Sequence, residues 1–299
     1  MNHFELKDFL SKLIIFDENE LLDIINLLQY NFDPESLKIT DKKIKSRFNN
    51  TETGISNSKS LSKQDARIYK YYLNRYTIFS KLQTNKSCCL YMTDELWYSV
   101  TPEDISLFIA DYIYSCLLNS KKDLNKTIII DCCCGGGGNT IQFAKKFPNC
   151  IGVDNNIEHL YCTYKNSELY NVQDRVLLKY GDWFKKEDDL LNLLNQTGNC
   201  VGCVFSSPPW GGPEYLLSEY YDLEKNLNGF GGGLTNILMS FKKFSKNIVL
   251  FLPKNSNLVQ LSEITEKVFD KDTRCRIIYV KSNGYLKGLL CMWGEDIVF

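Results

Sequence analysis

The sequence lacks several features that would place it in common classes of protein. None of its 299 residues belong to an apolar run near the roughly 20 residues that span a bilayer, so we expect no membrane segment. Its first residues lack the basic flank and apolar centre of a signal peptide. Basic residues are not in surplus, because the formal net charge is −1, which argues against a protein that coats long nucleic acids. We therefore expect a protein that stays inside the cell.

Histidine is also scarce, and the cysteines are not arranged as metal ligands usually are. The chain has two histidines, His3 and His159, and twelve cysteines, but no pair of Cys-x-x-Cys elements. Cysteines stand next to one another in Cys88-Cys89 and Cys132-Cys133-Cys134, which favours reduced thiols over disulfides. We expect no metal, with a zinc site as the alternative.

The N-terminal part of the sequence has helical periodicity. Apolar residues at helical spacing predict a hairpin of helices over 4–15 and 18–30, with Asp17 and Glu20 as a capping box between them. Residues 49–62, rich in Asn, Ser, Thr and Gly, predict a linker. A helix over 65–82 follows, and Thr101-Pro102-Glu103 predicts another, with the proline at its first position after a capping threonine.

After Lys126 the pattern changes to short apolar runs separated by helical stretches. The runs 127–131, 150–154, 176–180, 201–205 and 247–252 predict buried parallel strands, and 275–280 and 289–293 predict two more. Repeated βαβ units indicate an α/β fold with a doubly wound sheet and ligands at the carboxyl ends of its strands. We divide the chain into a hairpin and linker (1–62), a helical extension (63–125) and the sheet domain (126–299).

The stretch from Lys38 to Lys86 is locally basic, with twelve Lys and Arg residues against three acids. Tyrosines such as Tyr69, Tyr71 and Tyr72 are interleaved with its later part, which is compatible with a short phosphorylated ligand that has a stackable base. A solvated helix face followed by a linker explains the first half equally well.

The loop after the first strand of this domain has the composition of a cofactor site. Asp131 is followed by three cysteines and Gly135-Gly136-Gly137-Gly138, and a helix is predicted over 141–146. A dinucleotide fingerprint would need a glycine at Ile141, so NAD is disfavoured. The acid-x-x-x-Gly-x-Gly-Gly spacing, with Gly135 and Gly137, resembles that of class I methyltransferases that bind S-adenosylmethionine.

Two more acids follow the next two strands. Asp154 stands where a carboxylate accepts from ribose hydroxyls, and Asp182, followed by Trp183 and Phe184, stands where an adenine amine would be bound. Each acid alone is more often a cap or surface residue, but three at successive strand ends form a coherent set.

The run Ser207-Pro208-Pro209-Trp210 follows the fourth parallel strand. The prolines hold this backbone extended, so its carbonyls cannot enter a helix ladder and can accept from an amine beside the indole. A serine, two prolines and an aromatic residue resemble the element of methyltransferases that act on exocyclic amines of nucleobases.

Five strings together resemble the trimethylguanosine synthase family, from about Asp65 to the C-terminus. They are Lys70-Tyr-Tyr-Leu-Asn-Arg75, Trp97-Tyr-Ser-Val-Thr101, Gly138-Asn-Thr-Ile-Gln-Phe-Ala144, Ser207-Pro-Pro-Trp-Gly-Gly-Pro213 and Phe251-Leu-Pro-Lys-Asn255. The resemblance implies a Rossmann-like class I methyltransferase fold with a seven-stranded sheet and an N-terminal helical extension. It implies S-adenosylmethionine as cofactor and transfer of methyl groups to N2 of the 7-methylguanosine cap of small nuclear and nucleolar RNAs. We then expect a monomer in the nucleus, or also in the cytoplasm, with capped small RNA as its partner. The first sixty residues have no counterpart in the family.

The resemblance also implies roles for individual residues. Trp210 stacks on the methylated guanine, Ser207 and the Pro208 carbonyl meet the N2 amine, and Asp131 and Asp154 bind the cofactor. Tyr215 and Lys254 match positions that contact the cap phosphates, with Lys254 in place of an arginine. Glu95 and Thr101 fall on positions near the cofactor and Asn166 on one near the substrate.

Two alternatives remain open at this point. One is a methyltransferase that acts on an internal guanine N2 or adenine N6 of RNA, since the Pro-Pro-aromatic element is shared. The other is a cap-binding module without turnover, against which the three strand-end acids argue.

Overall fold

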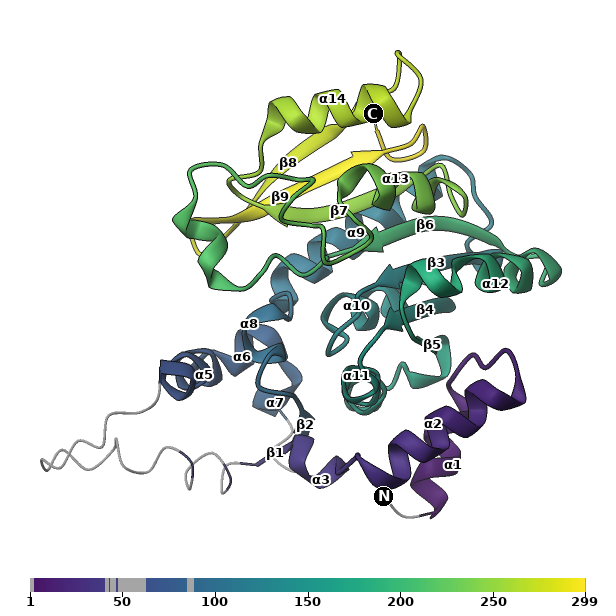
Figure 1. Ribbon diagram of the computed structural model, residues 1–299, viewed down its shortest axis with the longest axis vertical. Coiled ribbons are helices and arrows are strands. Elements are labelled where there is room, and N and C mark those ends of the chain that lie inside the picture. Colours follow the sequence, from purple (N-terminus) through teal and green to yellow (C-terminus); the bar gives the residue numbers. More distant parts are fainter. Residues whose placement is uncertain (1–2, 41–42, 44–46, 48–62, 85–88, 299) are drawn as a thin grey trace, which may run out of the picture.

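A seven-stranded sheet forms the centre of the computed structural model, which describes residues 3–40, 43, 47, 63–84 and 89–298 (Figure 1). The strand order is β5-β4-β3-β6-β7-β9-β8. β3 to β7 are parallel, and β9 runs antiparallel to both β7 and β8. The strands are β3 (Thr127–Cys132), β4 (Asn149–Asp154), β5 (Val176–Tyr180), β6 (Cys200–Ser206), β7 (Ile248–Pro253), β8 (Arg276–Ser282) and β9 (Tyr285–Trp293). The predicted doubly wound, mostly parallel sheet is confirmed, and the order reverses between β3 and β6, where such sheets bind ligands.

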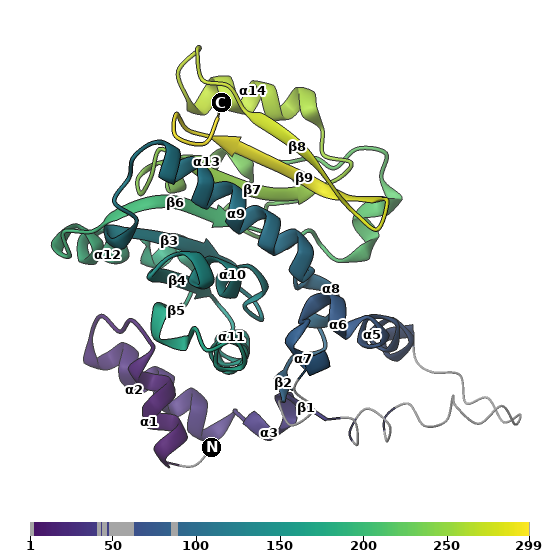
Figure 2. The same cartoon turned by 180° about the vertical axis from the view of Figure 1, so that it is seen from behind.

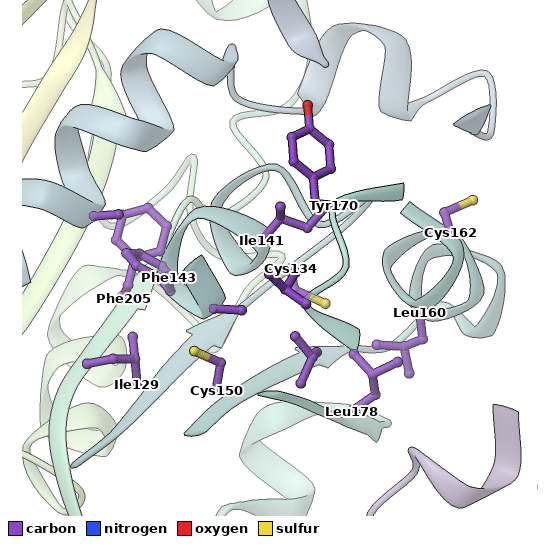
Figure 3. Packing of buried hydrophobic residues seen from close by; sticks show 14 of the residues in the cluster. Ile129, Cys134, Ile141, Phe143, Cys150, Leu160, Cys162, Tyr170, Leu178 and Phe205 are labelled. Carbon is purple, nitrogen blue, oxygen red and sulfur yellow. The ribbon is translucent and has the colours of Figure 1, made fainter. Parts of the chain in front are cut away.

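Alternate residues of the buried strands face two different helical layers. In β3, Ile129 belongs to one core cluster, whereas Ile128 and Ile130 belong to the other. Figure 3 shows the first cluster, in which Ile129, Cys150 and Leu178 come from neighbouring strands. The helices of the first face are α9 (Glu103–Asn119), α10 (Gly138–Lys146) and α11 (Ile157–Leu169), and those of the second are α12 (Trp183–Gln196), α13 (Leu234–Lys242) and α14 (Leu258–Val268). Short 3-10 turns, η1 (Leu124–Lys126), η2 (Gln173–Arg175) and η3 (Pro213–Leu217), complete this part.

The N-terminal hairpin packs against the sheet and does not form a separate unit. It consists of α1 (His3–Ser11) and α2 (Glu18–Tyr30), which both views show beside β5 and α11 (Figures 1 and 2). The chain between the helices adds to the edge strand, because Ile14 N donates to Leu178 O at 2.7 Å and Leu178 N donates to Lys12 O at 2.8 Å. This pairing satisfies backbone groups that an exposed edge strand would leave open. Residues 3–40 therefore share the core of the sheet domain, while the predicted linker 49–62 lies outside the described residues.

The hairpin is locked to β5 by a buried ion pair. Lys179 is 1% exposed and its Nζ lies 2.6 Å from Glu20 Oε1 and 2.9 Å from Ile14 O. Burial lowers the pKa of Lys179. Burial alone would raise the pKa of Glu20, but hydrogen bonds from Lys179 and the Phe16 amide outweigh it and lower that pKa. The predicted cap is present, since Asp17 accepts from Glu20 N, but the Glu20 carboxylate accepts from Phe16 N and not from Asp17 N.

The helical extension differs from its prediction in two places. The expected helix over 65–82 is broken into three, and the second break lies where Ser80 N leaves the helical ladder and donates to the Glu103 carboxylate. Pro102 is the N-cap of α9 and not its first residue, and the Thr101 hydroxyl does not cap the helix but accepts from Asn139. The elements are α3 (Pro34–Leu37), β1 (Lys38–Ile39), α5 (Lys63–Leu73), α6 (Arg75–Ile78), α7 (Lys81–Thr84), β2 (Leu90–Tyr91) and α8 (Leu96–Ser99), with β1 antiparallel to β2.

Two further findings concern the whole described chain. Every cysteine within it is a free thiol. No helix within it has the length and apolar character needed to cross a membrane.

We predict that Glu20→Gln lowers the free energy of unfolding by about 3 kcal/mol or more, because it leaves the buried Lys179 ammonium without its counter-charge. The double variant Glu20→Leu/Lys179→Met should recover most of this loss. Urea unfolding followed by circular dichroism measures both. Since the pKa of Glu20 is lowered, the stability that its carboxylate contributes should be fully present above the ordinary pKa of a glutamate. This stability should be lost only as the pH falls through the lowered pKa. A single variant as stable as the parent would contradict the assignment.

Candidate active site

A cavity of about 660 Å³ lies at the carboxyl ends of four neighbouring parallel strands. The loops after β3, β4, β5 and β6 form one side of it, residues 95–101 of the helical extension form another, and residues 229–243 close the third. Its volume is in the range of pockets that hold cofactors. The predicted residues that line it are Glu95, Thr101, Gly135, Asp154, Asp182, Trp183 and Ser207. The predicted residues outside its lining are Asp131, Gly137, Asn166, Pro208, Trp210, Tyr215 and Lys254.

The glycine loop lets the helical extension pack directly on the start of α10. A Cβ at Gly138 would lie 2.8 Å from a methyl group of Val100 and 3.0 Å from the Thr101 carbonyl oxygen. Gly135 and Gly137 have φ angles of +54° and +86°, a region that side chains disfavour. The glycines are therefore needed both for the turn and for the contact that closes this side of the cavity.

The carboxylate of Asp154 lies at the end of β4 and is held by backbone donors on both oxygens. Oδ2 accepts from Gly135 N at 2.9 Å, and Oδ1 accepts from Asn156 N at 3.0 Å. The residue is 8% exposed and lines the cavity. Because a carboxylate oxygen has two lone pairs, Asp154 retains acceptor capacity for a ligand.

Asp131 lies behind the glycine loop, and its carboxylate has a structural contact with α10. Its Oδ2 accepts from the Thr140 hydroxyl, which ties β3 to α10, and its Oδ1 is buried without a partner among the described residues. Burial raises the pKa of Asp131 to about 7, with the nearby Asp154 adding to the effect of burial. Direct contact of Asp131 with a cofactor stays a prediction.

The residues after β5 combine a cap with an aromatic wall. Asp182 is the N-cap of α12, accepts from Phe184 N at 3.1 Å, and also faces the cavity. Trp183 is 3% exposed and donates from Nε1 to the Ser240 hydroxyl, so most of its ring belongs to the core. Phe184 is less buried and packs edge-on against Phe230, with ring centroids 5.1 Å apart.

Two polar side chains near the glycine loop have different roles. Asn139 lines the cavity and donates to the Thr101 hydroxyl at 2.9 Å, and its Oδ1 is buried with no partner in the part of the chain that the structure describes. Asn166 is fully buried, with its amide bonded to the backbone of Tyr91 and to Gly136 O. Both polar atoms of the amide thus bond to the backbone and position the glycine loop, and the predicted contact of Asn166 with substrate stays a prediction.

The Ser207–Trp210 run reaches the cavity through its first residues. Ser207 and Pro209 line the cavity, Pro208 is buried, and Trp210 is half-buried beside them. The indole is fixed, because Nε1 donates to Phe251 O at 3.2 Å and the ring packs edge-on against Tyr215 at 5.3 Å. The carbonyl-rich strand end and the aromatic ring thus lie next to the cavity, as the sequence predicts.

Asn255, the neighbour of Lys254 in the chain, ties the turn after β7 to the segment that carries Tyr215. The Asn255 amide donates to Tyr215 O at 3.1 Å and to Ser218 O at 2.9 Å, which joins the turn after β7 to η3. Burial raises the pKa of Tyr215, and the nearby Tyr71 of α5 raises it further. Tyr71 in turn packs against Tyr98 of α8, with ring centroids 6.5 Å apart, so two rings of the helical extension lie together near Tyr215.

Much of the basic stretch lies outside the described residues, which leaves its predicted phosphate site untested. Within the described part, the Arg75 guanidinium lies over the rings of Tyr72 and Tyr76, at 4.2 and 4.3 Å. Arg47 forms a two-point ion pair with Asp94 at 2.8 Å. Arg47 and Arg75 therefore already interact with other side chains of the protein.

The lining suits a cofactor that carries positive charge. Four acids, Glu95, Asp154, Asp182 and Glu187, line the cavity together with the basic residues Lys243 and His159. Lys243 is already paired with Glu187 at 2.7 Å. The free acceptor of Asn139 and the acidic strand ends fit the ammonium, sulfonium and ribose groups of S-adenosylmethionine. We infer that Glu95, Asn139, Asp154 and Asp182 would hold it.

Sequence reasoning missed several lining residues on the second side of the sheet. Phe230, Gly231, Asn236 and Lys243 come from a segment twenty or more positions after the Pro-Pro-Trp run. The glycine run 231–233 was a usable signal, since a Cβ at Gly231 would lie 2.0 Å from the Phe184 ring. Among the residues that the structure describes, no group of three metal-ligating side chains is found.

Comparison with known proteins gives a consistent result. Residues 126–296 match a family model described as RNA cap guanine-N2 methyltransferase. Trimethylguanosine synthase of Saccharomyces cerevisiae is 48% identical over 247 residues, which cover 83% of this chain and 73% of that protein. Trimethylguanosine synthase of Schizosaccharomyces pombe is 29% identical over 223 residues, covering 74% and 84%. Both alignments are long enough to include parts of the helical extension as well as the sheet domain.

Solved structures support the fold. A putative methyltransferase from Porphyromonas gingivalis W83 superposes with a TM-score of 0.54 at 16% identity, over 95% of this chain and 60% of that one. At this identity the similarity concerns the architecture alone.

We predict that the stability of the cofactor-free protein falls as the pH rises from about 4 to about 7 through the contribution of Asp131. Its pKa is about 7 in the folded chain and near 3.8 when unfolded, so the folded state holds the proton longer across this range. Asp131→Asn should remove this fall. Thr140→Val, which deletes only the hydrogen bond, should cost about 1 kcal/mol and keep the pH dependence. Urea unfolding at several pH values measures all three proteins, and an identical slope in Asp131→Asn would refute the assignment.

Proposed function

The chain belongs to the RNA cap guanine-N2 methyltransferase family and methylates N2 of the 7-methylguanosine cap, and we propose that it adds two methyl groups and acts on small nuclear and nucleolar RNAs. Family membership does not favour the alternative of an internal guanine or adenine as target. The support for the finer proposal is the 48% identity to a trimethylguanosine synthase, together with the strings that resemble that family. A nuclear location, or a nuclear and cytoplasmic one, is part of the same proposal.

The observation that carries the chemistry is the position of the Ser207–Trp210 run. Ser207 and Pro209 line the same cavity as the strand-end acids, and the next residue along is the anchored indole of Trp210. One end of the cavity wall therefore offers acceptors for a cation, and the other offers carbonyls beside an aromatic ring. An amine held at those carbonyls is adjacent to a cofactor held at the acids.

Binding of the cap base is assigned to Trp210. A guanine methylated at N7 carries positive charge, so an indole face attracts it more than an unmethylated guanine, by about 1–2 kcal/mol where water is excluded. The edge-on contact with Tyr215 and the bond to Phe251 O hold the indole in one orientation. This rigidity lowers the ordering cost of stacking.

Orientation of the amine is assigned to Ser207 and Pro208. Their backbone carbonyls cannot join a helix ladder, and they accept from the N2 hydrogens so that its lone pair is directed into the cavity. S-adenosylmethionine, when bound, supplies an activated methyl group on its sulfonium sulfur. Glu95, Asp154 and Asp182 hold this cation by charge, and Tyr215 with Lys254 contacts the cap phosphates. We propose that Ser207 and Pro208 supply no strong general base, because the methylated amine is acidic enough to release its proton to water.

Mass spectrometry of the product tests the number of methyl groups. The protein is incubated with 7-methylguanosine diphosphate and S-adenosylmethionine, and GDP serves as the control without the N7 charge. We expect a product with one added methyl group that is converted to one with two, and little reaction with GDP. A reaction that stops after one methyl group would overturn the proposal of trimethylation.

Paired variants test the division of the site. Trp210→Ala should reduce kcat/KM for the cap by at least about 30-fold, the loss of about 2 kcal/mol of stacking and cation–π attraction, with cofactor affinity within about twofold. Asp154→Asn should do the reverse and weaken the cofactor first. Steady-state kinetics and calorimetry with the cofactor product give both values. Equal loss of both affinities in Trp210→Ala would disprove the stacking role.

A further inference from the structure

His159 lines the cofactor cavity, and none of the assignments above uses it. It stands on the first turn of α11, three residues after Asn156, the N-cap of that helix. The residue is 9% exposed, so a polar imidazole has been placed against the cavity wall at the cost of removing it from water. Such a side chain requires partners, and its two ring nitrogens have different ones.

One nitrogen faces the ribose-binding carboxylate. Nδ1 lies 3.2 Å from Asp154 Oδ1, the oxygen that otherwise accepts only from Asn156 N. Since an ionised carboxylate offers acceptors alone, Nδ1 carries the hydrogen in this contact. The histidine therefore completes the set of donors around Asp154, whose other oxygen is held by Gly135 N.

The other nitrogen faces the helical extension. Nε2 lies 3.4 Å from the Thr93 hydroxyl and 4.0 Å from Glu95 Oε2. Thr93 in turn accepts from Leu96 N, at the start of α8. One imidazole thus joins the end of β4 to the segment of the helical extension that forms another side of the cavity.

The charges around the ring favour its protonated form. Asp154 from β4, Glu95 before α8 and Glu158 on α11 itself all act in this direction, and together they outweigh the burial that lowers the pKa, so that the pKa of His159 is raised. A ring between two acids screens their mutual repulsion. Without it, Asp154 would keep its two backbone donors but lose its side-chain donor, and the repulsion between the two carboxylates would be unscreened.

We propose that His159 is a positioning residue for the cofactor, which acts through Asp154 and Glu95 by holding these two acids on either side of its ring in the cavity wall. The inference rests on the use of S-adenosylmethionine in this cavity. It predicts a role in cofactor affinity and none in cap binding, because Ser207, Trp210 and Lys254 have no contact with the imidazole among the described interactions.

Two variants of similar size separate the two nitrogens. In His159→Asn the amide nitrogen takes the place of Nδ1 and can still donate to Asp154. In His159→Gln it takes the place of Nε2, and the bond to Asp154 is lost. Calorimetry with S-adenosylhomocysteine, which binds without turnover, measures cofactor affinity, and kinetics at saturating cofactor give kcat and the KM for 7-methylguanosine diphosphate.

We expect His159→Gln to weaken S-adenosylhomocysteine at least about tenfold and His159→Asn no more than about threefold, with kcat and the KM for the cap within about threefold in both. Equal affinities in His159→Gln and the parent would overturn the proposal. Equal loss in both variants, or a loss confined to kcat, would also overturn it, because neither follows from the Nδ1 contact. The parent protein separates the two claims: if it failed to bind S-adenosylhomocysteine, the cofactor assignment itself would fail.

Discussion

The buried carboxylate of Asp154 requires hydrogen-bond donors, and meeting that requirement shapes the whole cofactor side of the molecule. Its donors come from Gly135 N after β3, from Asn156 N before α11 and from His159 on that helix. A buried anion without these partners would be strongly unfavourable. The loops after two neighbouring strands are therefore fixed relative to each other, and the acid remains at the cavity wall before any ligand arrives.

The remaining walls depend on close approach of backbone to backbone. Val100 and Thr101 pack on Gly138, where a side chain would collide with them, and Asn166 bonds to Gly136 O and to Tyr91 from beneath. These contacts hold the helical extension over the glycine loop. At the far edge, the segment after α1 pairs with β5, and the Lys179–Glu20 ion pair secures it. The helical extension thus shapes the cavity, and the N-terminal hairpin protects the β5 edge of the sheet.

The cofactor and the cap base are distinguished by the charge and the shape of the surfaces that would bind them. Acidic side chains at strand ends favour a cationic cofactor, whereas the anchored indole of Trp210 beside Tyr215 favours a flat, charged base. Ser207 belongs to both regions, since it lines the cavity and precedes the indole. Methyl transfer depends on this adjacency, because only a short approach between amine and methyl group converts binding into reaction.

Local sequence patterns were enough to predict which strands and helices follow one another along the chain of the sheet domain. They also predicted the glycine loop, the acids at three strand ends and the stiff Pro-Pro-Trp element. These depend on periodicity and on backbone restrictions that neighbouring residues impose. Tertiary structure alone decided three other features. The helix predicted over 65–82 breaks at Ser80, which donates to Glu103, and the Thr101 hydroxyl accepts from Asn139 instead of capping α9. The side-chain amide of Asn166 is bonded to backbone groups. Tertiary structure also decided that His159 lies between Asp154 and Glu95, residues five and sixty-four positions away. Such contacts have no local signature, because they arise only when folding brings distant segments together and each buried polar atom must find a partner.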